Sequence, residues 1–175
     1  LEDDALLNTK TNKILDHLKD LKGFDCISLE TRKRKKIISK TKTRINEDFY
    51  LHKLIQDKCG AAAYILSPKG AKLLLNHIMS KGVSLSDYIL SNGVNWKHGQ
   101  VVPAIAIQLD CCEYYGLKSP INVSTNINNS KKPSKSLKFY VRRIKGQSRI
   151  AMNKLLNIFS LNKEIEINAD DFYKE

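Results

Sequence analysis

An acidic cluster at the start of the sequence is the first candidate for chemistry. Glu2, Asp3 and Asp4 follow an apolar residue, and three adjacent carboxylates repel one another unless a cation neutralises them. Mg²⁺ and Mn²⁺ prefer carboxylate oxygens, so an acidic turn at a strand end can hold either metal against a diphosphate. The metal then offsets the charge that builds on a leaving phosphate. The alternative is an acidic segment that stabilises the N-terminus of a following helix through its dipole.

A run of small residues is the second candidate. Residues 60–66 read GAAAYIL, and small side chains in a strand let a ligand or another backbone approach closely. Tight packing in an ordinary core explains the same composition equally well. The third candidate is the lone carboxylate of Asp87, which suits either a general base or a cap for the turn that follows it.

Helices are expected on both sides of the small-residue run. Residues 10–22 place apolar side chains on one face at helical spacing, and Gly23 ends this helix. A second helix is expected over residues 68–80, capped by Ser67, and residues 84–91 predict a further short helical turn. The apolar faces of the two longer helices consist of Ile14, Leu15, Leu18 and Leu21 in the first and Ala71, Leu74, Leu75 and Ile78 in the second.

Short apolar or β-branched runs predict the strands, and their alternation with helices predicts an α/β domain. Pro103 indicates an edge strand or a bulge. The expected strands are residues 24–29, 49–55, 60–66 and 101–107, with another in the C-terminal stretch at Ile165 and Ile167. Residues 119–136 are expected to be a loop or linker, and residues 137–159 amphipathic helical pieces with a basic face.

Basic residues are concentrated in two segments. The 175 residues include 30 Lys or Arg and 18 Asp or Glu, a formal net charge of +12. Residues 31–44 and 131–149 each hold eight basic residues and no acidic one, so the other 14 basic residues are outnumbered by the 18 acidic ones. We expect the first segment to be a loop. Basic segments attract nucleic acid, anionic membranes or a phosphorylated glycolipid, or they are simply solvated.

Composition excludes several classes of protein. A hydrophobic content of 42% excludes a disordered basic tail. No apolar run approaches the ~20 residues that a membrane-spanning helix requires. The four cysteines lack zinc-binding spacing and are too few for a disulfide scaffold, which favours reduced thiols.

The order of several segments resembles glycosyltransferase family 25, the lipooligosaccharide (LPS) biosynthesis glycosyltransferases. The resemblance covers about residues 1–121, and its most specific parts are LEDD and GAAAYILSPKGAKLLL in their order and spacing. The segments that carry it are LEDD (1–4), FDCISL (24–29), GAAAYILSPKGAKLLL (60–75), Asp87 and VPAIAIQ (102–108).

The resemblance implies a GT-A-like, Rossmann-related α/β fold over residues 1–121, followed by a basic linker and C-terminal extension over residues 122–175. Family members carry a region before the acidic motif that supplies the first strands, so the chain is expected to be N-terminally truncated. The implied reaction transfers a sugar, commonly galactose, from a UDP-sugar to a lipooligosaccharide acceptor, with metal assistance and inversion.

The resemblance also assigns roles to individual residues. Asp4 and Glu2 would bind Mn²⁺ or Mg²⁺, with Asp3 supporting them against the UDP diphosphate. Gly60 and Tyr64 are expected in the donor-binding region, and Asp87 is the candidate for acceptor binding or the general base. Separately, Trp96 suits either stacking on a sugar ring or a core anchor.

These expectations describe a cytoplasmic enzyme whose basic segments contact anionic lipid at the inner face of the inner membrane, where the glycolipid acceptor is anchored. One alternative is a non-catalytic remnant of such an enzyme. The other is a nucleic-acid-binding module, suggested by the net charge alone. It is disfavoured because the chain shows no RNA-binding or zinc-finger pattern, and its basic segments contain one aromatic pair, Phe139-Tyr140.

Overall fold

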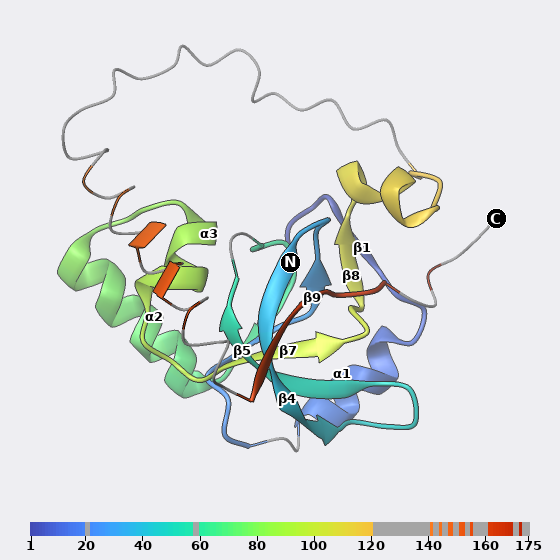
Figure 1. Cartoon of the computed structure of the whole chain (residues 1–175), viewed down its shortest axis with the longest axis horizontal. Helices are drawn as coiled ribbons and strands as arrows, with labels where there is room; N and C mark the ends of the chain where they lie inside the picture. Colours follow the sequence, from blue (N-terminus) through green and yellow to red (C-terminus); the bar gives the residue numbers. More distant parts are fainter. Residues whose placement is uncertain are drawn as a thin grey trace, which may run out of the picture.

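The computed structural model of the protein describes residues 1–19, 22–57, 60–120, 161–169 and 172, with seven positions between 141 and 155 (Figure 1). Its described residues form a mixed α/β structure with two mixed sheets and short helices. The second basic segment, the linker and the amphipathic pieces expected over residues 137–159 fall largely outside the described residues, as does Leu21.

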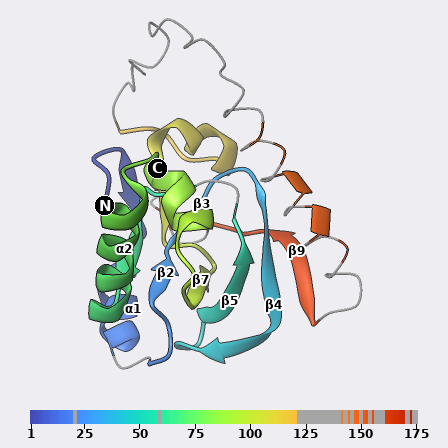
Figure 2. The ribbon, with the colours of Figure 1, turned by 90° about the vertical axis from the view of Figure 1, so that its left-hand side faces the viewer.

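The larger sheet has six strands in the order β6-β2-β7-β5-β4-β9 (Figure 2). β2 and β7 are parallel, and the other neighbours are antiparallel. The strands are β2 (Cys26–Ser28), β4 (Lys35–Arg44), β5 (Tyr50–Gln56), β6 (Tyr64–Leu66), β7 (His98–Val102) and β9 (Asn162–Glu166). β9 comes from the expected C-terminal extension and forms an edge strand beside β4.

The smaller sheet continues the central strands of the larger one. It has the order β1-β8-β3, with β1 (Ala5–Leu7), β8 (Ala106–Gln108) and β3 (Glu30–Thr31). Leu29 links β2 to β3, and its backbone oxygen accepts hydrogen bonds from the Ile105 and Ala106 amides at 2.9 and 3.1 Å. The parallel path of β2 and β7 is therefore repeated by β3 and β8 in the second sheet.

Two helices pack beside the β2 and β6 end of the larger sheet (Figure 2). α1 (Thr11–Lys19) buries Ile14 and Leu18 in the main core. α2 (Pro68–Lys81) is capped by the Ser67 hydroxyl, which accepts from the Gly70 amide at 2.9 Å. A side chain at Gly70 would place a Cβ 1.9 Å from the backbone oxygen of Asp25, so this helix lies directly against the chain that enters β2. α3 (Ser86–Tyr88) and a π-helical turn (Ile89–Gly93) follow.

Most of the expected elements are present, and four expectations were wrong. The strand expected over residues 60–66 is limited to β6, because residues 60–63 follow an irregular path that begins at the positive φ of Gly60. The basic segment 31–44 is not a loop: its β-branched residues form most of β4, with Ile37 and Ile38 buried. Residues 101–107 are not one strand, because the chain leaves β7 at the cis Val102-Pro103 peptide and re-enters the smaller sheet as β8. The acidic cluster precedes a strand, β1, so it does not stabilise a helix start.

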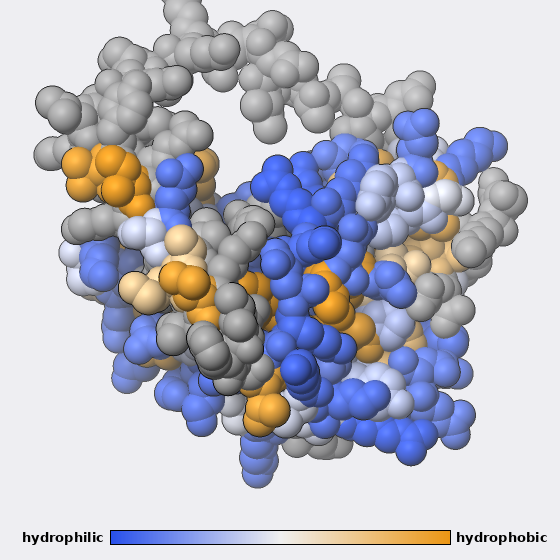
Figure 3. Space-filling model, in the orientation of Figure 1, coloured by the Kyte–Doolittle hydropathy of each residue, from blue (hydrophilic) through white to orange (hydrophobic). Residues whose placement is uncertain are grey.

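The apolar face predicted for α2 is only partly covered. Leu75 is 60% exposed, and Gly70 is the one buried residue of the helix. Exposed Met79 near the end of the helix, and Val83, Leu85 and Tyr88 after it, continue this surface. Figure 3 shows hydrophobic patches on the side of the molecule where α2 and α3 lie. Within the described residues, none of the helices has the length and apolar composition needed to cross a bilayer.

Candidate functional site

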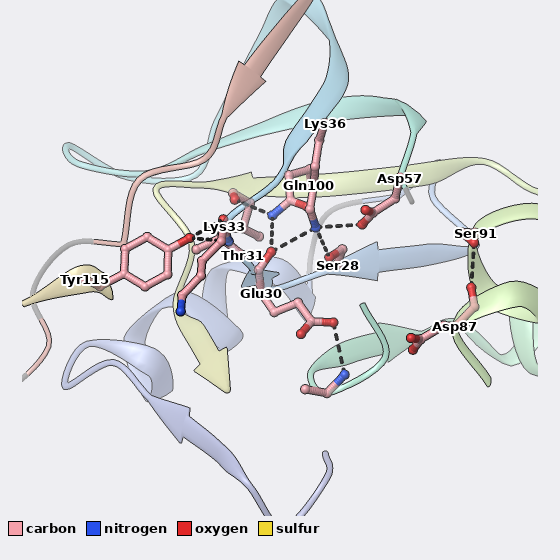
Figure 4. Close-up of polar contacts among 12 residues, drawn as sticks. Ser28, Glu30, Thr31, Lys33, Lys36, Asp57, Asp87, Ser91, Gln100 and Tyr115 are labelled. Atoms are coloured by element: carbon pink, nitrogen blue, oxygen red, sulfur yellow. Dashed lines mark hydrogen bonds and ion pairs between the residues drawn. The ribbon is translucent and has the colours of Figure 1, made fainter. Parts of the chain in front are cut away.

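A buried polar cluster lies where the two sheets meet (Figure 4). Its centre is Lys36 of β4, whose side chain is 2% exposed and forms an ion pair of 2.7 Å with the Asp57 carboxylate. The ammonium also donates to the Gln100 side-chain oxygen at 2.8 Å, the backbone oxygen of Glu30 at 3.0 Å and the Ser28 hydroxyl at 3.3 Å. An ammonium buried this deeply is tolerated only when it is paired and hydrogen-bonded, as it is here.

Glu30 of β3 is the most unusual carboxylate in this cluster. It is 1% exposed, and its Oε1 accepts a hydrogen bond of 3.0 Å from the Ala62 amide. Its Oε2 is buried and accepts none from the part of the chain that the structure describes. Burial, opposed by the Lys36 ammonium and aided by nearby carboxylates that include Asp87, raises the pKa of Glu30 to about 7. Glu30 therefore exchanges a proton close to neutral pH, the range in which acid–base groups are most effective.

The small-residue run forms one wall of this site. Gly60 has a φ of +128°, and a Cβ there would lie 2.6 Å from Glu30 Oε1. The glycine is thus required both by its own backbone and by the carboxylate beside it. Ala61, Ala62 and Ala63 are buried, so the run packs closely while presenting an amide to Glu30.

Tyr64 begins β6, directly after the buried alanines of the small-residue run, and pairs with Ser28 of β2. Burial raises the pKa of its phenol, with smaller contributions from Cys26 and Glu2. The Glu2 amide donates to the backbone oxygen of Ala62, two residues before Tyr64, so the acidic cluster lies near this predicted donor-binding residue.

Backbone and side-chain hydrogen bonds attach the acidic cluster to this wall and to β8. The Glu2 amide donates to the backbone oxygen of Ala62 at 2.8 Å, and the Glu2 carboxylate accepts from the Gln108 side-chain amide at 3.1 Å. The backbone oxygen of Asp4 accepts from the Leu109 amide at 2.9 Å. Glu2 and Asp3 are exposed and Asp4 is half-buried, so only part of the cluster faces the protein.

The acidic cluster has an oxygen suited to a divalent cation. Asp4 Oδ1 is buried and receives no hydrogen bond from the described residues. Among those residues, no three His, Cys, Asp or Glu side chains converge as a metal-binding group. Mg²⁺ nevertheless commonly binds through one or two protein carboxylates when substrate phosphates supply other oxygens. The cluster therefore fits a cation shared with a diphosphate, rather than one enclosed by the protein.

Asp87 lies near the Glu30 carboxylate and belongs to α3. Figure 4 shows its carboxylate and that of Glu30 pointing toward one another from α3 and β3. Its backbone oxygen accepts a hydrogen bond of 2.5 Å from the Ser91 hydroxyl, which fixes the start of the π-helical turn. The π-helical turn that follows has Tyr88 as its N-cap, with no side-chain capping bond, so Asp87 does not cap that turn.

The predicted site residues thus lie around a residue that the sequence patterns did not reveal. Gly60 lies against the Glu30 carboxylate, Asp87 faces it, and Glu2 is hydrogen-bonded to Ala62 beside it. Tyr64 follows Ala62 by two residues, and Asp3 is exposed. The sequence signal that could have identified Glu30 is its place as an acidic residue directly after the apolar run FDCISL, which predicts a buried strand. No protein-family model, no curated protein and no solved structure matches the chain.

Proposed function

We propose that the chain carries the active-site region of a GT-A-like glycosyltransferase. It would transfer a hexose, with galactose as the first choice, from a UDP-sugar to the saccharide of a lipooligosaccharide. The observation that supports this proposal best is the convergence of separate segments on Glu30. The segments of the family resemblance are far apart in the sequence, yet hydrogen bonds join the acidic cluster to Ala62, Leu29 to Ala63, and Ile105 to Leu29.

The two facing carboxylates suit the proton transfer that this reaction requires. The acceptor hydroxyl oxygen attacks the anomeric carbon while the bond from that carbon to the UDP oxygen breaks, and UDP leaves with the electron pair. The hydroxyl proton passes to a carboxylate, and we assign this role to Asp87 because it is less enclosed than Glu30. Glu30 acts as a positioning residue, holding the Ala62 amide and setting the charge opposite Asp87.

A cation would occupy the other side of the site. Asp4, with Glu2 beside it and Asp3 exposed nearby, would hold Mn²⁺ or Mg²⁺, which offsets the charge on a departing diphosphate. On this proposal the acceptor is a glycolipid anchored at the cytoplasmic face of the inner membrane, and basic segments of the chain contact anionic lipid there.

The test is the release of UDP from UDP-galactose by the full chain, with Mn²⁺ and a lipooligosaccharide acceptor. We expect Asp87→Asn to lower kcat by about 10² to 10⁴-fold, because the base is lost while the shape is kept. Asp4→Ala should raise the Mn²⁺ concentration needed for half-maximal rate. The matched control is Asp48→Asn, at an exposed carboxylate that pairs with Lys10, and it should leave the rate unchanged.

Separate results would overturn separate parts of the proposal. Full activity of Asp87→Asn would exclude Asp87 as the base, and an unchanged Mn²⁺ dependence of Asp4→Ala would exclude the cation site. If the folded chain neither releases UDP nor is stabilised against heat by UDP with Mn²⁺, the glycosyltransferase assignment is wrong.

A further inference from the structure

A pocket of about 280 Å³ lies beside the buried polar cluster, between the end of β5 and the segment that leads into β7. Asp57 belongs to both regions: it lines the pocket, and it pairs with Lys36 in the cluster. The volume lies just below the roughly 300 to 1,000 Å³ of most small-molecule sites. It therefore suits a ligand of the size of one sugar ring better than a complete nucleotide sugar.

One buried side-chain oxygen in the lining has no partner among the described residues. Gln56 is 7% exposed and lines the pocket, and its Oε1 accepts no hydrogen bond from the described part of the chain. A buried carbonyl oxygen without a donor is costly, so a ligand hydroxyl that reaches this oxygen gains an interaction that the described part of the chain does not supply.

The lining includes the apolar Leu54, Ile55 and Val94, and its polar residues are not strongly charged. Burial lowers the pKa of His98 to about 4, so its ring is neutral at pH 7 and both donates and accepts hydrogen bonds. The Asp57 carboxylate is already balanced by the Lys36 ammonium. Asn95 and Ser91 add an amide and a hydroxyl, and Lys53 is the one lysine or arginine among the described residues of the lining. This set favours a neutral ligand with several hydroxyls over a phosphate, which would need more cations.

An aromatic ring completes the pocket. Trp96 is half-buried and meets His98 edge to face, with ring centroids 5.8 Å apart and planes at 63°. Such a contact restrains the indole, and a restrained aromatic ring is a favourable surface for the apolar C–H face of a pyranose. We infer that this pocket binds one neutral pyranose unit. Its identification as part of the acceptor rests on the proposed function, whereas the binding itself does not.

The experiment uses the fact that Trp96 is the single tryptophan of the chain. Methyl β-galactoside is titrated into the full chain while tryptophan fluorescence is followed, with glycerol as the control for a non-specific effect. We expect a saturable change with a dissociation constant on the order of millimolar, as is typical of a small ligand with few contacts. Gln56→Leu should weaken this binding about tenfold.

Two further variants keep the result interpretable. Asn95→Ala changes an exposed residue of the lining, so it should fold normally and weaken binding several-fold. Gln147→Leu makes the same chemical change as Gln56→Leu at an exposed position and should bind the sugar like the unaltered chain. No saturable change with galactoside, glucoside or N-acetylglucosaminide, or equal binding by all three variants, would overturn the inference.

Comparison with the UDP-release assay separates this inference from the proposed function. Sugar binding that depends on Gln56 and Asn95, in a chain without UDP release, would support the pocket and contradict the glycosyltransferase. UDP release in a chain whose fluorescence does not respond to any of the sugars would support the glycosyltransferase and contradict the sugar-binding pocket.

Discussion

Both halves of β4 carry two lysines, but the first half also carries two isoleucines and the second two threonines, and their environments are very different. The first half, residues 35–39, lies between β5 and β9 and buries four of its five residues. The second half, residues 40–44, pairs with β5 from Lys42 onward and bonds the chain beside β9 only through the Lys40 amide within the described structure, and all five residues are exposed. Lys36 and Lys42 belong to the same strand, yet the first is the centre of the buried cluster and the second lies over the Tyr50 ring. The difference indicates that a lysine of this basic run can be buried where a carboxylate, here that of Asp57, neutralises it.

The largest expected effect on stability is at Lys36, the buried lysine of β4. Lys36→Met should lower the free energy of unfolding by about 3 to 5 kcal/mol, because Asp57 then stays buried without the ammonium that neutralises it. Denaturant unfolding of both chains measures the difference. Adding Asp57→Asn should recover part of the loss. A cost for Lys36→Met below 1 kcal/mol would mean that the two halves of β4 do not differ in the way proposed.

The next largest effect is on the pH dependence of stability, through the carboxylate of Glu30, whose backbone oxygen accepts a hydrogen bond from Lys36. The pKa of the Glu30 carboxyl group rises from 4.5 to about 7 on folding. Its protonation therefore stabilises the folded protein fully below pH 4.5, and this contribution is lost progressively as the pH rises from 4.5 through 7. Glu30→Gln cannot lose a proton. The stability of the unaltered chain relative to this variant should therefore fall by about 3 kcal/mol between pH 4.5 and pH 8.

Unfolding at matched pH values measures this difference, and other titrating groups cancel because both chains share them. A constant difference across the pH range would show that Glu30 titrates in the folded chain as it does when unfolded. A difference of the opposite sign would show that the carboxylate is stabilised in its charged form.

A smaller effect is expected at Gly60, which closes the site over Glu30. Gly60→Ala should cost about 2 kcal/mol, from an unfavourable φ and from the contact of 2.6 Å with the Glu30 carboxylate. Gly23→Ala is the matched control, since Gly23 also has a positive φ, +102°, but no described atom within 4 Å of its Cβ position. It should cost about half as much in the same unfolding measurement. Equal costs would indicate that Glu30 does not crowd the Gly60 position.

The sequence predicted elements whose signals are local. α2 begins at Ser67 and Pro68 as their capping chemistry requires, and the apolar run at residues 24–29 contains β2. β4 was not predicted, because its lysines masked the β-branched residues Ile37, Ile38, Thr41 and Thr43. Local charge disfavoured a strand there, and the compensating carboxylate lies on a different strand end, at Asp57.

The candidate site divides in the same way. The acidic cluster, Gly60 and Asp87 were found because their residue types and order stand out in the sequence. Glu30 was missed because its character comes from long-range contacts. Its neighbour Ala62 is 32 residues away, and its high pKa comes from burial that no local pattern reports.

The smallest expected effect is at the exposed half of β4, and it makes the comparison quantitative. The Lys42 ammonium lies 3.5 Å from the centroid of the Tyr50 ring, an exposed cation–π contact worth about 0.5 to 1 kcal/mol. Lys42→Met should therefore cost at most about 1 kcal/mol. A double-mutant cycle with Tyr50→Leu isolates the contact from the lost packing of either side chain. The same substitution six positions apart in one strand then differs several-fold in its cost, and that ratio measures what the buried carboxylate contributes. A ratio near one would mean that strand position, rather than the partner at Asp57, determines how a lysine is tolerated.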